Sequence, residues 1–181
     1  MTGNPRLKWY AMAVALILTC GGGLMLGKLH EKDYMGALYE RRDFTLLDDQ
    51  GEFFRLNSLP EKKLALLVFT PDGIPLDAVK PFAEFSRHLE NLQSRGIEPF
   101  LVSRTNREIV RNFKRATGFG ARFLVDAGGA VGRITGIWSG AQLSSNWGYS
   151  LVDRDFRVLW SATSDEPMSY ARLMEELKKA R

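Results

Sequence analysis

Residues 64–70 read LALLVFT, an uninterrupted apolar run of the kind found in strands that are buried on both faces. Ile97–Val102 and Arg122–Val125 are two further strand candidates. Between the first two strands, six apolar residues recur at helical spacing before Gly96, namely Leu76, Val79, Phe82, Phe85, Leu89 and Leu92. This pattern predicts one core-facing helix, and Pro81 is expected to kink its first turns.

Two hairpins are predicted at the ends of this alternation. The first covers residues 44–56 and turns at Asp48–Gly51, and the second covers residues 149–161 and turns at Asp153–Asp155. Aspartates at such positions usually stabilise the turn itself, so a metal role for either pair is not expected.

Three more helices complete the pattern. Thr105 and Glu108 have the spacing of a capping box, in front of a helix that carries Ile109, Val110 and Phe113. A short helix is expected near Val131–Ile137. Pro167 is predicted to open a last helix, whose shared face holds Tyr170, Leu173, Met174 and Leu177. The whole order implies an α/β layered domain with a mixed β-sheet flanked by helices.

Composition excludes several classes of protein. The 181 residues include one cysteine and two histidines that lie far apart, so an internal disulfide, a Cys-x-x-Cys pair and a cysteine-rich zinc site are excluded. The sequence pI is about 9.3. Arg6 and Lys8 precede the first apolar segment, and without them the net charge falls from +4 to only +2. A nearly balanced remainder argues against a nucleic-acid partner.

The N-terminal segment has the properties of a membrane anchor. Trp9–Leu26 carries no charge and has the length needed to cross a bilayer. The basic residues before it favour a cytoplasmic N-terminus. The predicted organisation is therefore a cytoplasmic segment 1–8, a transmembrane helix 9–27, a connector 28–42 and an extracytoplasmic domain 43–181. This places the protein in the bacterial inner membrane as a single-pass protein, with its C-terminal domain on the periplasmic side.

Small residues recur every four positions along the predicted anchor: Ala11, Ala15, Thr19, Gly23 and Gly27. Such a stripe lets a second transmembrane helix approach closely, although small residues are also common in membrane helices generally. Two alternatives to a retained anchor stay open. The segment could be a cleaved signal peptide, or a lipoprotein signal acylated at Cys20, although neither cleavage pattern fits well.

The order of elements resembles the thioredoxin-like superfamily. The likeness is greatest to membrane-tethered thiol–disulfide oxidoreductases and peroxiredoxin-like redoxin domains, and it spans about Asp43 to Lys179. It rests on the opening Asp43–Leu47, the buried strand ending in Phe69, the segment Asp126–Val131, and Leu151–Asp155. Each piece is weak by itself, and their order and spacing carry the assignment.

The resemblance also shows which reactive residues are missing. The redox Cys-x-Pro-Cys of the oxidoreductases would fall on Gly73, Ile74, Pro75 and Leu76, which keep the proline but neither sulfur. The peroxidatic cysteine of a peroxiredoxin would lie near Asp77–Val79 and is also absent. The cis-proline facing such a site would stand at Trp147. Disulfide exchange needs a thiolate, so the sequence predicts a degenerate redox site with no catalytic residue, cofactor or metal.

The segment that follows Ile137 is longer than the family pattern. It includes Trp138, Gln142, Leu143, Asn146 and Trp147. Aromatic residues in a polar frame are typical of interface loops, and this segment is predicted to bind a partner. The alternative is that Trp138 packs inward and that Trp147 fills the space of the lost proline.

The sequence thus favours a non-enzymatic accessory or assembly subunit of a larger membrane complex, such as a photosynthetic or respiratory one. Its expected partners are the lipid bilayer and other membrane subunits, which would be bound through the anchor and the 138–147 loop. An alternative is a divergent thiol–disulfide oxidoreductase or peroxiredoxin-like enzyme that uses a partner's thiol. A third possibility is a module that binds a small ligand, such as haem or lipid, in the vacated cleft.

Overall fold

A computed structural model describes residues 43–72, 78–138 and 146–179. These residues all belong to the unit Arg41–Arg181. The predicted anchor, its small-residue stripe and the connector lie outside the described residues. Within the described ranges, no helix is both long and apolar enough to span a bilayer.

A seven-stranded mixed sheet forms the centre of the domain, with the strand order β2-β1-β5-β4-β3-β6-β7. Its middle strands β3, β4 and β5 are mutually parallel, and the remaining pairs are antiparallel. The strands are β1 Thr45–Asp48, β2 Phe53–Arg55, β3 Leu64–Phe69, β4 Ile97–Ser103, β5 Arg122–Val125, β6 Trp147–Val152 and β7 Val158–Ser164. Both predicted hairpins and the three predicted strands at 64–70, 97–102 and 122–125 are confirmed.

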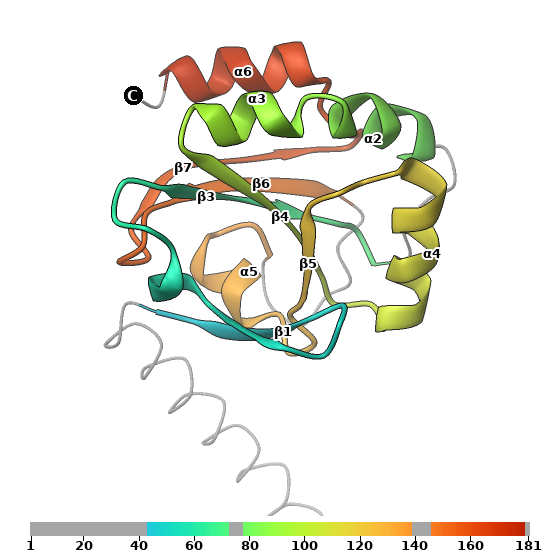
Figure 1. Ribbon diagram of the computed structural model, residues 1–181, viewed down its shortest axis with the longest axis horizontal. Helices are drawn as coiled ribbons and strands as arrows, with labels where there is room; N and C mark the ends of the chain where they lie inside the picture. The colour runs from blue at the N-terminus through green and yellow to red at the C-terminus, as the bar shows by residue number, and fades with distance from the viewer. Residues whose placement is uncertain (1–42, 73–77, 139–145, 180–181) are drawn as a thin grey trace, which may run out of the picture. The chain divides into compact units, whose positions relative to one another are not determined.

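Four helices pack on one face of this sheet, where they share a single apolar core with β3, β4, β5 and β6. They are α2 Val79–Ser86, α3 Leu89–Ser94, α4 Arg107–Thr117 and α6 Tyr170–Lys179. The short helix α5, Ala130–Ile134, lies on the other side, as Figure 1 shows. Every second residue of a strand points to the same face, so Leu66 and Val68 face the four helices while Phe69 faces α5.

Aromatic rings fill the second face near the first hairpin. Phe44 contacts the ring of Phe156 at 5.2 Å and that of Phe54 at 6.2 Å. Phe54 in turn lies 4.5 Å from Phe100 of β4. These contacts join the first hairpin, the centre of the sheet and the β6–β7 turn. A short 3₁₀ helix, Leu56–Ser58, leads the chain out of the first hairpin.

The predicted single helix before Gly96 is in fact two helices, and the break is not at Pro81. Pro81 is the third residue of α2, within the first turn, where backbone N–H groups have no partner inside the helix. The chain breaks at Arg87 and His88 instead. Ser86 donates a hydrogen bond to the Gly118 carbonyl at 2.7 Å, and His88 stacks on the ring of Tyr170 at 4.1 Å. His88 is half-buried there.

Two predicted helix starts were also wrong in detail. Asn106, rather than Thr105, caps α4, because its side chain accepts the N–H groups of Glu108 and Ile109 at 2.9 and 3.2 Å. The last helix begins at Tyr170, three residues after Pro167, and Ser169 accepts the N–H of Arg172 at 3.3 Å. In both cases the side chain that can accept a backbone N–H sets the boundary.

Candidate functional site

The carboxyl ends of the parallel strands β3, β4 and β5 meet at one edge of the sheet, which is where open α/β sheets usually bind ligands. Thr70 and Asp72 follow β3, Arg104 follows β4, and Asp126 follows β5. The predicted degenerate redox site at Gly73, Ile74, Pro75 and Leu76 continues from this edge but lies outside the described residues. The chemistry available at this edge is therefore judged from the neighbouring side chains that the structure describes.

The first turn of α2 holds the position where a reactive thiol was expected. Ala78 precedes the helix as its N-cap residue and is buried, and Val79 is the first helical residue. A helix N-terminus lowers the pKa of a thiol and would favour a thiolate there. Methyl and isopropyl groups occupy that favourable place, so these two residues provide neither a nucleophile nor a proton-transfer group.

Thr70 adds an unusual polar group to this edge. Its backbone N–H donates to the Val102 carbonyl at 2.9 Å, which continues the β3–β4 pairing by one residue. Its Oγ1 is buried without a hydrogen-bond partner, as is Nε1 of Trp138, and these are the two such side-chain atoms among the described residues. Thr70 follows Phe69 and so points toward the opposite face of the sheet from Phe69 and Trp138. The two atoms therefore do not form one site.

Trp147 begins β6 and is almost completely buried, at 1% exposure. Its ring lies 4.9 Å from that of Phe82 in α2. This agrees with the packing alternative, in which tryptophan fills the interior next to the vacated site. Its ring is therefore not available to a partner in this structure.

Trp138 is also buried, at 4% exposure, beneath Phe69 on the α5 face of the sheet. The guanidinium carbon of Arg104 lies 5.6 Å from the centre of its ring, and Arg104 also pairs with Asp72 at 3.6 Å. In the predicted interaction loop, Asn146 is half-buried, while Gln142 and Leu143 lie outside the described residues. Partner binding by this loop stays a prediction.

Asp126 shapes the segment between these groups. Its two carboxylate oxygens accept the N–H groups of Ala130 and Gly132, at 2.9 and 3.1 Å, and so cap α5. Burial raises the pKa of Asp126, and the hydrogen bonds from the α5 backbone partly oppose that rise. Both oxygens are used by the backbone, so the side chain is a structural cap.

Comparison with protein families confirms the predicted relationship. Residues 40–161, two thirds of the chain, match the AhpC/TSA family. The chain belongs to the AhpC/TSA family. No curated protein sequence matches the chain closely enough to count as a relative.

Solved structures show the same fold as this AhpC/TSA domain. Peroxidoxin BcpB from Mycobacterium tuberculosis superposes with a TM-score of 0.64 at 22% identity, covering 77% of this chain and 92% of its own. The reduced 2-Cys peroxiredoxin of Plasmodium vivax has a TM-score of 0.63 at 15% identity, with coverages of 76% and 91%. Enterococcus faecalis AhpC gives 0.61 at 19% identity, with coverages of 76% and 87%. At these identities the likeness establishes the fold alone.

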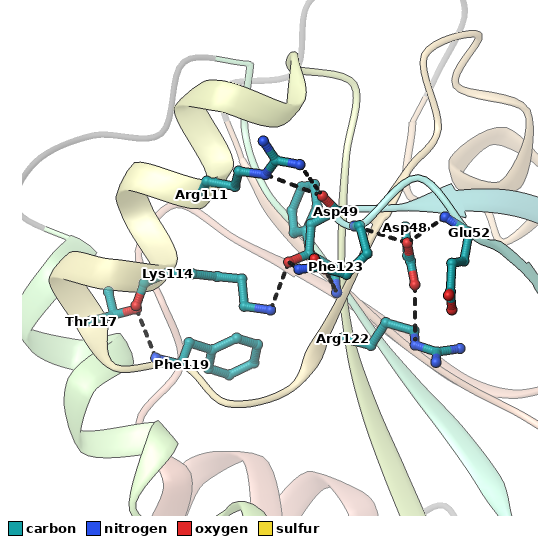
Figure 2. A network of polar contacts seen from close by, with 10 residues as sticks. Asp48, Asp49, Glu52, Arg111, Lys114, Thr117, Phe119, Arg122 and Phe123 are labelled. Atoms are coloured by element: carbon teal, nitrogen blue, oxygen red, sulfur yellow. Dashed lines mark hydrogen bonds and ion pairs between the residues drawn. The ribbon is translucent and has the colours of Figure 1, made fainter.

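A second polar cluster ties the first hairpin of the AhpC/TSA domain to α4 and β5 (Figure 2). Asp48 stabilises the turn as predicted, since its Oδ1 accepts the N–H groups of Gln50 and Glu52, each at 2.9 Å. Asp49 instead reaches across the domain. It accepts Nζ of Lys114 at 3.0 Å, and its carbonyl accepts Arg111 at 2.8 and 3.2 Å.

Electrostatics keep Asp49 ionised despite its burial. Burial by itself raises the pKa of Asp49, but the hydrogen bond and charge of Lys114 outweigh it, helped by the N–H of Phe123 and the amide of Gln50. The pKa therefore ends below its usual value of 3.8. This pair could not be predicted from local sequence patterns, because Asp49 and Lys114 are 65 residues apart. All these partners of Asp49 are residues of the same domain, so we interpret the cluster as a structural clamp between the first hairpin, α4 and β5.

Lys114→Met is expected to destabilise the domain by about 1–3 kcal/mol at pH 7, because a buried carboxylate loses its charged partner. Since the folded state lowers the pKa of Asp49, the wild-type pair contributes stability above pH 4, and this contribution is lost as the pH falls through the folded-state pKa. The difference between variant and wild type should therefore shrink as the pH falls below about 4, as measured by urea unfolding.

Lys63→Met is the matched control for that experiment. Lys63 also pairs with a carboxylate, Glu98 at 2.9 Å, but both side chains are more exposed, at 37% and 24%. Its loss should cost less than about 1 kcal/mol. Equal costs for the two lysines at pH 7 would contradict the clamp.

Proposed function

We propose that this protein is a membrane-tethered accessory or assembly subunit whose AhpC/TSA domain has lost thiol chemistry and serves to bind other proteins. One observation carries the proposal. The matched segment 40–161 contains no cysteine, and the position that favours a thiolate, the start of α2, is occupied by Ala78 and Val79. Peroxide reduction by a thiol needs a thiolate nucleophile, and this domain has none of its own.

The surroundings of that position support the proposal. Trp147 packs against Phe82 at the start of α2, and the shallow apolar pocket beside it is lined by Val68, Pro81, Phe82, Phe85, Tyr149 and Met168. Burial raises the pKa of Tyr149 to about 12, and its oxygen accepts the N–H of Met168 at 2.7 Å. Tyr149 therefore stays protonated at physiological pH and is fixed as part of the core.

The membrane part of the proposal rests on the sequence. Trp9–Leu26 is apolar and uncharged, the bases before it favour a cytoplasmic N-terminus, and the stripe from Ala11 to Gly27 suits contact with another membrane helix. The domain would then lie on the periplasmic side of a bacterial inner membrane. Purification from native membranes in mild detergent should recover the chain with other membrane subunits, whereas an isolated monomer would count against a role in a complex.

The loss of thiol chemistry is tested by turnover. Wild-type protein and Cys20→Ser should consume hydrogen peroxide and reduce insulin no faster than buffer with dithiothreitol. Cys20→Ser/Val79→Cys is the matched gain-of-thiol variant, and its single cysteine should react with iodoacetamide faster than free cysteine at pH 7, because residue 79 is only half-buried and is the first residue of a helix. Catalytic peroxide consumption by the Cys20→Ser protein alone would overturn the proposal.

Family membership favours one alternative, in which the domain works as a peroxiredoxin-like enzyme with a thiol from a partner. The same assays repeated with candidate partner proteins separate the two. Turnover that requires both proteins, and that survives Cys20→Ser, would establish the alternative.

A further inference from the structure

An exposed aromatic face on the first hairpin remains unexplained by the core and by the clamp. Phe53 is 75% exposed, and Leu47, directly opposite it across the β1–β2 pair, is 39% exposed. Neighbours on both strands, Leu46 and Phe54, are buried on the other face. The hairpin thus has a complete inner surface and still presents two large apolar side chains outward.

Basic side chains lie on the same strand as Phe53 and at the turn of this hairpin. Arg55 follows on the same face, since it pairs with Thr45 two residues along from the Leu47–Phe53 pair, and it is exposed. Arg107 and Arg111 reach the hairpin turn from α4. A Cβ on Gly51 would lie 2.9 Å from Nη1 of Arg107, and Arg111 donates to the Asp49 carbonyl.

Acidic groups do not balance these bases at the surface of the hairpin. Asp48 and Asp49 are 2% and 3% exposed, and their carboxylates already pair with Arg122 and Lys114. Among the exposed side chains of residues 45–55 and 107–111, Glu52 and Glu108 are the two acidic ones, against the three bases Arg55, Arg107 and Arg111. The face therefore combines an apolar centre with an excess of positive charge, which is the chemistry that recognises an anionic lipid surface.

We propose that the face formed by Leu47, Phe53, Arg55, Arg107 and Arg111 docks on an anionic bilayer, with Phe53 inserted among the lipid headgroups. This inference rests on the membrane tether of the proposed function. The connector 28–42 spans at most about 54 Å even when fully extended, and only Asp43 and Phe44 separate it from β1. A tether of that length keeps the hairpin near the bilayer, so a weak two-component attraction is sufficient for docking.

Site-specific lipid quenching of the full-length chain tests this docking. A fluorescent label on Glu52→Cys, in a Cys20→Ser background, is compared with the same label on Thr163→Cys, an exposed residue of the edge strand β7. Vesicles of phosphatidylcholine, with or without 30% phosphatidylglycerol, carry headgroup spin labels as quenchers. The label at residue 52 should be quenched in the anionic vesicles and much less in the neutral ones, whereas the label at residue 163 should be quenched in neither.

Three variants identify the groups responsible. Phe53→Ser should lower the docking constant about tenfold. Arg55→Gln and Arg107→Gln should each lower it about fivefold and reduce its salt dependence. Ile109→Ser removes a different exposed apolar side chain, at 46% exposure, on α4 and should change nothing.

Equal quenching at residues 52 and 163, or quenching unaffected by Phe53→Ser, would overturn the docking proposal. If the label at residue 52 became shielded from a soluble quencher in detergent as the protein concentration rose, the face would bind a second copy of the chain. That result would also overturn the docking proposal. The predicted anchor is tested separately: a chain with a transmembrane helix should float with neutral vesicles and stay bound to them after an alkaline carbonate wash. A chain that floats but shows no quenching refutes the docking and leaves the tether intact.

Discussion

Trp147→Ala is expected to destabilise the domain by about 3–5 kcal/mol, the range for large-to-small changes in a packed core. Trp147 is among the largest fully buried side chains and belongs to the core that joins the four helices to the sheet. Its ring contacts Phe82 of α2, so truncation would leave a cavity at the first turn of that helix. Thermal and urea unfolding measure the loss, and near-ultraviolet circular dichroism reports whether the remaining core stays ordered.

Trp160→Ala is the matched control. Trp160 lies on the edge strand β7 and is only partly buried against the same core, so its loss should cost about 1–2 kcal/mol. An equal or smaller cost for Trp147 would contradict its assignment as core. It would revive the prediction that this ring serves a partner.

Gly132→Ala is expected to be almost as damaging, although alanine normally stabilises a helix relative to glycine. A Cβ at this position in α5 would lie 2.0 Å from Cε3 and 2.4 Å from Cδ2 of Trp138. The indole ring cannot bend, so either Trp138 or α5 must shift, at a cost of about 2–4 kcal/mol after the gain in helix propensity. Urea unfolding of the variant against wild type measures this cost.

Two further variants show whether the ring is responsible. Gly120→Ala places its Cβ no closer than 3.7 Å to Leu89 and should change stability by less than about 0.5 kcal/mol. Gly132→Ala combined with Trp138→Leu should be more stable than the two separate costs predict, by at least about 1 kcal/mol, because the smaller side chain makes room. Strict additivity would show that the damage arises elsewhere.

The fold was predictable because local patterns and the order of elements agreed. The run Leu64–Phe69 was long enough to mark a strand buried on both faces, and the Asp/Gly turn residues marked both hairpins. Helix boundaries were harder. Apolar spacing continued unbroken from Phe85 to Leu89 because α2 and α3 bury the same face, so periodicity could not show the break at His88.

For the candidate site, the sequence alone could show only that the reactive cysteines are missing. Missing cysteines are visible in a sequence, and the structure adds that Ala78 and Val79 stand where a thiolate would be favoured. The groups that surround that position come from distant segments. The contacts of Arg104 with Asp72 and Trp138, and of Asp49 with Lys114, depend on strand register and helix placement, which leave no local signal. The exposure of Phe53 was hidden for the same reason, since alternation alone does not show which face of a hairpin is covered.

The aromatic cluster around Phe44 has a mechanical consequence. Any force carried along the chain before residue 43 reaches the domain at Asp43 and Phe44, just before β1, and Asp43 accepts the N–H of Asn57 at 3.1 Å. The Phe44 ring contacts Phe54 and Phe156, and the Phe44 carbonyl accepts the N–H of Leu56, so a pull on the chain should load the first hairpin and the β6–β7 turn as well as the β1–β5 pair. Asp43 and Phe44 thus distribute tension from the preceding chain over several contacts of the domain.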